Sequence, residues 1–137
     1  MSAEFVDTNV LVYAHDGSAG RKHSASVDLL TRLFDEQTGA LSVQVLAEFY
    51  VIATRKLGIH ADEAEQIIGD LRSWTIHRLG HSDLIQASRL HRRHKLSWWD
   101  ALVVQSALEL GCRVLWTEDL NHGQQIGDVT IQNPFRI

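Results

Sequence analysis

Four acidic residues stand in apolar surroundings, where a carboxylate has no obvious partner: Asp7, Glu48, Asp100 and Asp119. A carboxylate in such surroundings must be protonated, paired with a distant cation or bound to a metal ion. Carboxylates gathered in one place repel one another strongly unless a cation lies between them. Because ligation by oxygen alone, without Cys or His, selects a hard ion, these acids predict a Mg²⁺ or Mn²⁺ site.

Asp7 and Glu48 each have a simpler interpretation, which the sequence leaves open. Asp7 ends the predicted strand Glu4–Asp7 and could serve only as the N-cap of the following helix. Glu48 lies in the apolar run Val45–Ile52, and its own helix offers no basic residue at ion-pair spacing before Arg55. A distant Arg or Lys could pair with Glu48 instead of a metal ion.

Asp100 and Asp119 are open to a capping interpretation as well. Asp100 follows the predicted N-cap Ser97 by three residues, where an acid closes a capping box and faces the positive helix end. Asp119 follows a buried strand that ends at Thr117, and Glu118 competes with it as the site acid. We favour Asp119 because it shares a face with Thr117 if the strand extends through this point.

The elements that must position these acids are short apolar strands alternating with helices. The predicted strands are Glu4–Asp7, Ala40–Val43, Thr75–Leu79, Arg113–Thr117 and Val129–Gln132, with a loop over Glu118–Gly127. The predicted helices are Val10–Ala14, His23–Glu36, Val45–Leu57, Ala61–Trp74, Ser82–Lys95 and one that begins after Ser97 and ends before Gly111. This alternation indicates an α/β domain with a mostly parallel sheet, whose sites lie at the carboxyl ends of the strands.

Local signals predict where helices end and which faces they bury. Gly39 is expected to stop one helix, and Ser82 to cap another. The helix after Ser97 is apolar nearly all round, so the rest of the domain should pack against it. The apolar residues at helical spacing elsewhere are Val27, Leu30, Leu33 and Phe34 on one helix and Leu84, Ile85, Ala87 and Leu90 on another.

Composition indicates a small globular protein without secretion or membrane signals. A chain of 137 residues has the length of one domain, which we place at 1–137. Cys112 is the single cysteine and cannot form an internal disulfide, which fits a buried, inert thiol in a reducing cytoplasm. Neither a signal peptide nor a membrane span is expected. The net charge of −4 disfavours gripping nucleic acid by overall electrostatics, but a bound cation can supply positive charge locally.

Five short motifs occur in a characteristic order along nearly the whole chain. They are Val6–Leu11, Ala47–Phe49, Ser97–Leu102, Thr117–Gln124 and Asn133–Phe135. In this ordered set the chain resembles PIN-domain proteins, most closely the bacterial VapC-type toxins. The resemblance implies a PIN-like three-layer α/β/α sandwich with a central mostly parallel sheet of four to five short strands. It also implies a metal-dependent ribonuclease toxin, usually homodimeric, that a cognate antitoxin neutralises.

The resemblance also implies roles for particular residues. The four acids of the family correspond to Asp7, Glu48, Asp100 and Asp119. Three polar residues match neighbours that orient metal, water or substrate: Thr8, Asn9 and Thr117.

The resulting hypothesis is an endoribonuclease that hydrolyses RNA phosphodiester bonds. Asp7, Asp100 and Asp119 would bind Mg²⁺ or Mn²⁺ directly, while Glu48 completes the cluster or orients the attacking water. One alternative is a phospho-acceptor receiver module, but that fold requires adjacent acids after the first strand and a lysine after the last core strand. This chain has Asp7–Thr8 after the first strand and no lysine beyond Lys95. Another is a PIN-like fold that only binds RNA or a partner.

A basic run precedes the helix that carries Asp100. Its candidate substrate-binding residues are Arg89, Arg92, Arg93 and Lys95. They form either a solvated helix end or a rim that contacts RNA phosphates. The nearby His91 and His94 make only a weak zinc motif. Of the adjacent Trp98 and Trp99, we expect one to pack inward and the other to stack on a base or meet a second subunit.

Overall fold

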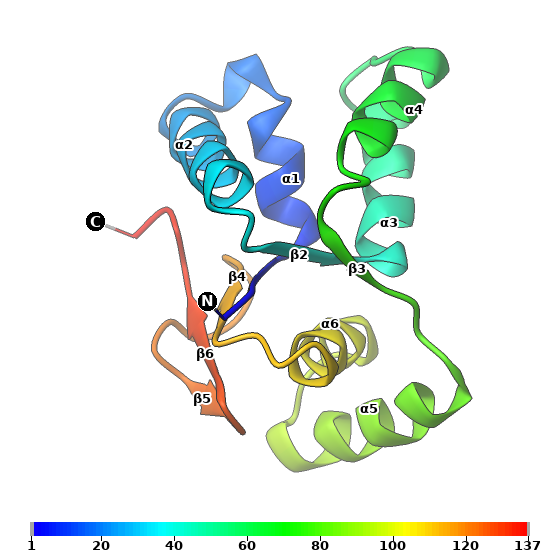
Figure 1. The fold of residues 1–137 in the computed structure, drawn as a ribbon, viewed down its shortest axis with the longest axis vertical. Coiled ribbons are helices and arrows are strands. Elements are labelled where there is room, and N and C mark those ends of the chain that lie inside the picture. The colour runs from blue at the N-terminus through cyan, green and yellow to red at the C-terminus, as the bar shows by residue number, and fades with distance from the viewer. Residues whose placement is uncertain (1, 137) are drawn as a thin grey trace.

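The computed structural model describes residues 2–136 and contains a six-stranded sheet between two layers of helices (Figure 1). The strands are β1 (Glu4–Val6), β2 (Gly39–Ser42), β3 (Thr75–His77), β4 (Val114–Trp116), β5 (Gln125–Ile126) and β6 (Val129–Gln132). The helices are α1 (Thr8–Ala14), the 3₁₀ turn η1 (Gly17–Ala19), α2 (Arg21–Glu36), α3 (Val43–Arg55), α4 (Ala61–Asp70), α5 (His81–His94) and α6 (Trp98–Glu109).

The strand order β3-β2-β1-β4-β6-β5 makes β1 and β4 direct neighbours at the centre of the sheet. All pairs are parallel except β5 with β6. The register pairs Val6 of β1 with Trp116 of β4, so that the two strands end level with each other. Residues that follow these strands, Asp7 and Thr117, therefore meet at one edge of the sheet, as the sequence predicted.

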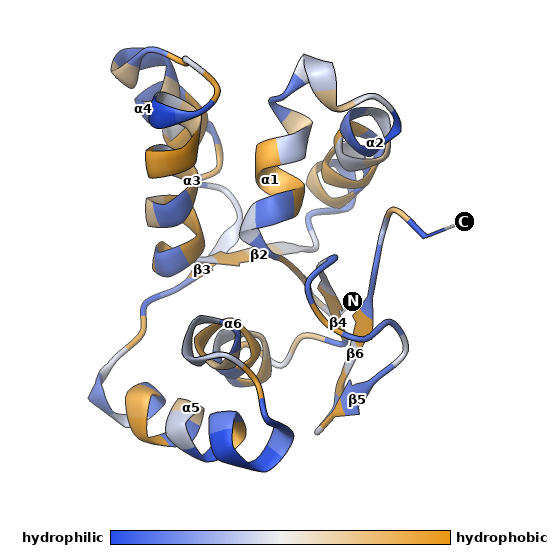
Figure 2. Ribbon diagram, turned by 180° about the vertical axis from the view of Figure 1, so that it is seen from behind, coloured by the Kyte–Doolittle hydropathy of each residue, from blue (hydrophilic) through white to orange (hydrophobic). Residues whose placement is uncertain are grey.

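Helices α1 to α4 cover one face of the sheet, while α6 lies on the other face with α5 outside it (Figures 1 and 2). Every residue of Ala101–Ala107 in α6 is buried, because this helix is packed between the sheet and α5. The prediction of a helix that is apolar nearly all round and lies in the core is confirmed.

Several element boundaries differ from those expected. A sixth strand, β5, lies within the predicted loop Glu118–Gly127, where it forms a short hairpin with β6. Gly39 does not stop a helix, because α2 already ends at Glu36 and Gly39 begins β2. The predicted helix Ala61–Trp74 also ends early, at Asp70, since residues 71–73 form a turn.

Two predicted helix faces were partly wrong. On α2, Leu33 is buried and Leu30 packs against the core as predicted, but Val27 and Phe34 are exposed, and the helix also buries Ser26 and Leu29. Along α5, Leu84 and Ile85 are exposed, and the inward positions are Asp83 and Ala87.

The start of α5 also differs from the prediction. The N-cap is Gly80 rather than Ser82, and the Asp83 carboxylate accepts a hydrogen bond from the Gly80 N–H at 2.8 Å. An inward-facing acid thus caps the helix that a serine was expected to cap.

The burial of Cys112 and the lengths of the helices agree with the predictions of an inert thiol and of a chain without a membrane span. The Cys112 thiol is buried, and burial raises its pKa to about 12, which keeps it in the unreactive protonated form. Within residues 2–136, no helix is both long and apolar enough to span a membrane.

Candidate active site

Four segments that are distant in sequence bring the predicted acids to one hollow of about 190 Å³. Asp7 follows β1, Asp119 follows β4, and Asp100 lies in the first turn of α6. One carboxylate oxygen from each of these three residues lies within 4.8 Å of the other two. Glu48, on α3, lines the same hollow but lies outside this group of three.

Asp7 is both a helix cap and a member of the acidic group. Its Oδ1 accepts a hydrogen bond from the Thr8 N–H at 2.7 Å, which caps α1. Its Oδ2 accepts one from the Thr117 hydroxyl at 2.8 Å. Only 5% of Asp7 is exposed, and this burial raises the pKa of its carboxyl to about 7 despite both hydrogen bonds.

Asn9 and Thr117 connect the ends of β1 and β4. The Asn9 amide donates to the Thr117 hydroxyl at 3.1 Å and to Asp119 Oδ2 at 3.0 Å. The Thr117 hydroxyl also accepts from the Asp119 N–H at 3.1 Å. These bonds fix the relative positions of the Asp7 and Asp119 carboxylates.

Glu48 is held by two neutral groups rather than by a cation. Its Oε1 accepts hydrogen bonds from the Thr8 hydroxyl at 3.3 Å and from the Gln44 amide at 3.2 Å. Burial raises the pKa of Glu48, and the charges of Asp100 and Asp119 add to the increase. Gln44 is not among the site residues predicted from the sequence, although its position one helical turn before Glu48 is a signal for such a contact.

Asp100 is positioned by the start of α6. The Ser97 hydroxyl accepts the Asp100 N–H at 3.1 Å, which confirms Ser97 as the N-cap. Burial raises the pKa of the Asp100 carboxyl, and the negative charge of Asp119 raises it further.

The four acids differ in burial: Asp7 is buried, Glu48 and Asp100 are half-buried, and Asp119 is exposed. Among residues 2–136, no Lys, Arg or His forms an ion pair with Asp7, Glu48, Asp100 or Asp119. The group offers only oxygen ligands, which suits a hard divalent ion such as Mg²⁺ or Mn²⁺.

Glu4, at the other end of β1, shows how this protein neutralises a buried acid for structural purposes. Only 2% of Glu4 is exposed, and its carboxylate accepts hydrogen bonds from Arg32 at 3.0 Å and Arg113 at 3.3 Å. The Trp116 indole adds a third bond at 2.9 Å. Although burial alone would raise the pKa of Glu4, these bonds outweigh it and the pKa is lowered.

A comparison with protein families agrees with this architecture. The family model of the PIN domain matches residues 5–125. The chain belongs to the PIN domain family. A comparison with curated proteins finds no match to the sequence.

Solved structures share the fold of this PIN domain. A toxin–antitoxin complex from Klebsiella pneumoniae is 19% identical, with 98% of this chain and 100% of the other covered at a TM-score of 0.74. The sarcin-ricin loop cleaving toxin VapC20 from Mycobacterium tuberculosis is 20% identical, with 85% and 92% covered at 0.68. VapBC2 from Rickettsia felis, bound to a DNA fragment from its promoter, is 18% identical, with 96% and 98% covered at 0.68.

Within this PIN domain, Glu118 and Asp119 have different surroundings. Glu118 forms an ion pair with Lys22 at 2.9 Å and accepts a hydrogen bond from the Tyr13 hydroxyl at 2.7 Å. Asp119, in contrast, lies beside Asp7 and Asp100. The geometry therefore separates the two neighbouring acids that the sequence left as competitors.

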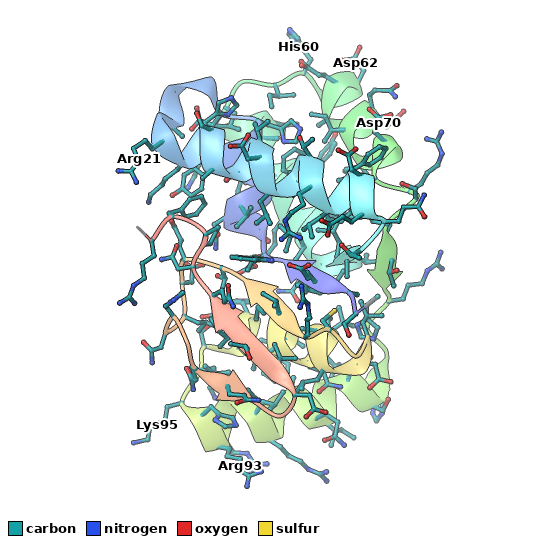
Figure 3. All side chains as sticks on the ribbon, turned by 60° about the vertical axis from the view of Figure 1, so that its left-hand side comes forward. Arg21, His60, Asp62, Asp70, Arg93 and Lys95 are labelled. Atoms are coloured by element: carbon teal, nitrogen blue, oxygen red, sulfur yellow. The ribbon has the colours of Figure 1, made fainter. Side chains whose placement is uncertain are left out.

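The basic run lies at the exposed end of α5. Figure 3 shows Arg93 and Lys95 pointing away from the body of the domain, and Arg89 and Arg92 are exposed as well. His91 does not join a metal site. Its ring bonds to the Leu96 carbonyl and packs edge-on against Trp98, and the group of three acids is the only candidate metal cluster in residues 2–136.

Proposed function

We propose that this PIN domain is a Mg²⁺- or Mn²⁺-dependent endoribonuclease. The observation that carries the proposal is the group formed by Asp7, Asp100 and Asp119, whose oxygens converge without an ion-paired cation among the described residues. Such a group is electrostatically unfavourable in an empty protein and favourable around a divalent ion. When bound, that ion supplies positive charge to the phosphoryl oxygens and makes water more acidic.

The proposed roles follow from the hydrogen bonds of each residue. Asp7, Asp100 and Asp119 would hold the ion, and Asn9 and Thr117 keep the first and last of these carboxylates in place. Glu48 would orient the attacking water, because its carboxylate faces the hollow and is fixed by Thr8 and Gln44. The raised pKa of the Glu48 carboxyl makes it a better proton acceptor at neutral pH.

The biological role that we propose is that of the toxin in a toxin–antitoxin pair, acting on RNA in the cytoplasm. Support comes from similar structures, which include toxin–antitoxin complexes and a toxin that cleaves the sarcin-ricin loop. The cognate antitoxin would be a protein partner. Co-expression with the product of an adjacent small gene should give a stable complex and relieve growth inhibition. Toxicity that no neighbouring gene product relieves would contradict the pairing.

We further propose a homodimer formed by a single domain that spans residues 1–137. Large apolar side chains remain exposed on several helices, including Phe34, Val51 and Ile85, and a second subunit would cover part of this surface. Sedimentation at micromolar concentration should give twice the chain mass of 15.5 kDa.

Cleavage of RNA by the purified protein tests the proposed activity. We expect cleavage of structured RNAs with Mg²⁺ or Mn²⁺, no cleavage with EDTA, and no cleavage by Asp7→Asn, because a neutral amide binds Mg²⁺ poorly. A folded wild-type protein that binds RNA but never cleaves it would favour the non-catalytic PIN alternative. The receiver alternative has lost its basis, since the chain belongs to the PIN domain family.

A further inference from the structure

Trp99 has the largest exposed fraction of the exposed large apolar residues that the structure describes, at 62%. Its neighbour Trp98 is instead partly buried and packs against the core and the ring of His91. This settles which of the two tryptophans faces inward. Exposure of one indole is common in proteins and does not indicate a binding role, so any such role for Trp99 depends on where the residue lies.

Trp99 lines the same hollow as the four acids and immediately precedes Asp100. The first turn of α6 therefore presents an aromatic ring and a carboxylate side by side. A ligand whose phosphate reached the acidic group would place its neighbouring nucleotide within reach of the ring.

Gln44 ties the backbone of Trp99 to the acidic group. Its Nε2 donates to the Trp99 carbonyl at 3.3 Å and to Glu48 Oε1 at 3.2 Å. The other amide atom, Oε1, is buried and has no hydrogen-bond partner among the described residues. Gln44 lines the hollow, and a buried acceptor without a partner has an energetic cost.

We propose that Trp99 stacks on an unpaired base next to the cleaved phosphodiester. The proposal rests on the proposed ribonuclease function and names a residue that would bind the nucleotide beside the cleaved bond. Bases in an A-form duplex are already stacked on one another and cannot open onto an indole, whereas unpaired bases can. The competing possibility is that a second subunit covers Trp99.

Binding measurements on a cleavage-deficient Asp119→Asn background test the stacking directly. The probes are a fluorescently labelled ten-nucleotide polypyrimidine RNA and a blunt RNA duplex of the same length. We expect Trp99→Ala to weaken binding of the single strand by roughly 5- to 100-fold, the cost of about one lost base–aromatic stack. Trp99→Tyr should retain most of the affinity, and duplex binding should be weaker and insensitive to both changes.

Phe34→Ala is the matched control, because Phe34 is also an exposed aromatic residue but lies on α2 and lines a different hollow. It should leave RNA binding unchanged. In the cleavage-competent protein, Trp99→Ala should raise KM for single-stranded RNA and largely preserve kcat.

Three results would overturn the proposal. The first is unchanged single-strand affinity in Trp99→Ala, and the second is an equal loss for strand and duplex. The third is a shift from dimer to monomer on sedimentation with RNA affinity intact, which would assign Trp99 to a subunit interface. None of these results contradicts the proposed ribonuclease activity if the wild type still cleaves RNA. A wild type that neither binds nor cleaves RNA would contradict both the ribonuclease activity and the stacking by Trp99.

Discussion

Glu4 begins β1 and Asp7 directly follows this strand. Both acids are buried, but only Glu4 has positively charged partners. Two arginines and an indole compensate the buried charge of Glu4 and lower its pKa. Asp7 receives only neutral hydrogen bonds, so burial dominates and raises its pKa to about 7. The metal-free protein therefore carries an uncompensated cost at Asp7 whenever this carboxyl is ionised.

This cost predicts an unusual pH dependence of stability. Between the pKa of Asp7 in the unfolded chain, 3.8, and the folded value of about 7, the folded chain holds a proton that the unfolded chain has released. Stability from this group is therefore lost as pH rises through 7. We expect the metal-free protein to lose about 2 kcal/mol of unfolding free energy between pH 5.5 and 8.5.

Denaturant unfolding in EDTA at several pH values measures this loss. Asp7→Asn removes the titrating group and should flatten the dependence. An equally steep pH dependence in Asp7→Asn would mean that other groups cause it.

The two neighbouring acids after β4 give a matched pair of variants. We expect Asp119→Asn to reduce RNA cleavage at least 100-fold, because it removes one of the proposed ligands. Glu118→Gln should keep most of the activity, since its partners are Lys22 and Tyr13 rather than the acidic group. Initial cleavage rates at saturating Mn²⁺ provide the measurement, and equal losses in both variants would contradict the assignment.

For single residues, the sequence is sufficient to predict the four acids of the site but not the residues that bond to them. Asp7, Glu48, Asp100 and Asp119 stood out because apolar neighbours left each carboxylate without a local cation. The hydrogen bond between Asn9 and Asp119, which lie 110 positions apart in the chain, depends on strand pairing that the sequence does not specify. The ion pair between Glu118 and Lys22, likewise, cannot be predicted from the sequence, because the two residues are distant in the chain.

Among the elements, the start of β2 depends on a contact between distant segments. A Cβ atom added at Gly39 would lie 2.4 Å from the ring of Trp74, so the indole packs directly on the backbone of the strand. The sequence suggested that Gly39 ends a helix, since a glycine there looks like a C-terminal signal. Close packing, rather than helix termination, explains this glycine.

Replacement of Gly39 should therefore destabilise the domain without touching the acidic group. We expect Gly39→Ala to cost on the order of 1–3 kcal/mol, the usual effect of overpacking. Gly17→Ala is the control, because nothing lies within 4 Å of the atom that it would add. Urea unfolding compares the two variants, and an unaffected Gly39→Ala would show that Trp74 can move aside at no cost.

The inward face of α5 was mispredicted because a polar network occupies it. Asp83 accepts a hydrogen bond from the Gln105 amide at 3.0 Å and lies 3.4 Å from His77 Nε2. His77 in turn bonds to the Ser106 hydroxyl at 2.8 Å. Hydrophobic periodicity finds the buried Ala87 but cannot detect the buried polar Asp83, and it therefore predicts Leu84 and Ile85 to face inward although they are exposed.

For the whole molecule, the order of short strands and helices was sufficient to predict a mostly parallel α/β fold. The antiparallel β5–β6 hairpin escaped detection because β5 has only two residues. The charge distribution is less obvious from the sequence. Although the net charge is −4, the end of α5 presents a group of exposed cations in the segment that leads to α6 and Asp100.

These cations predict how substrate binding depends on salt. We expect the double variant Arg92→Ala/Arg93→Ala to raise KM for RNA several-fold and to flatten its salt dependence, because two phosphate contacts would be lost. Lys56→Ala/Arg72→Ala removes the same charge from the C-cap of α3 and the turn after α4, and should have a much smaller effect. KM measured from 50 to 300 mM KCl tests this, and identical salt slopes for the wild type and the Arg92/Arg93 variant would exclude the contact.

The most direct test of the account is calorimetric titration of the metal-free protein with Mn²⁺. We predict saturable binding to the wild type and to Glu118→Gln, and binding at least tenfold weaker in Asp119→Asn, because only the last variant removes an oxygen of the acidic group. Equal Mn²⁺ affinity in all three proteins, or no binding to a folded wild type, would contradict the claim that these carboxylates form a metal site.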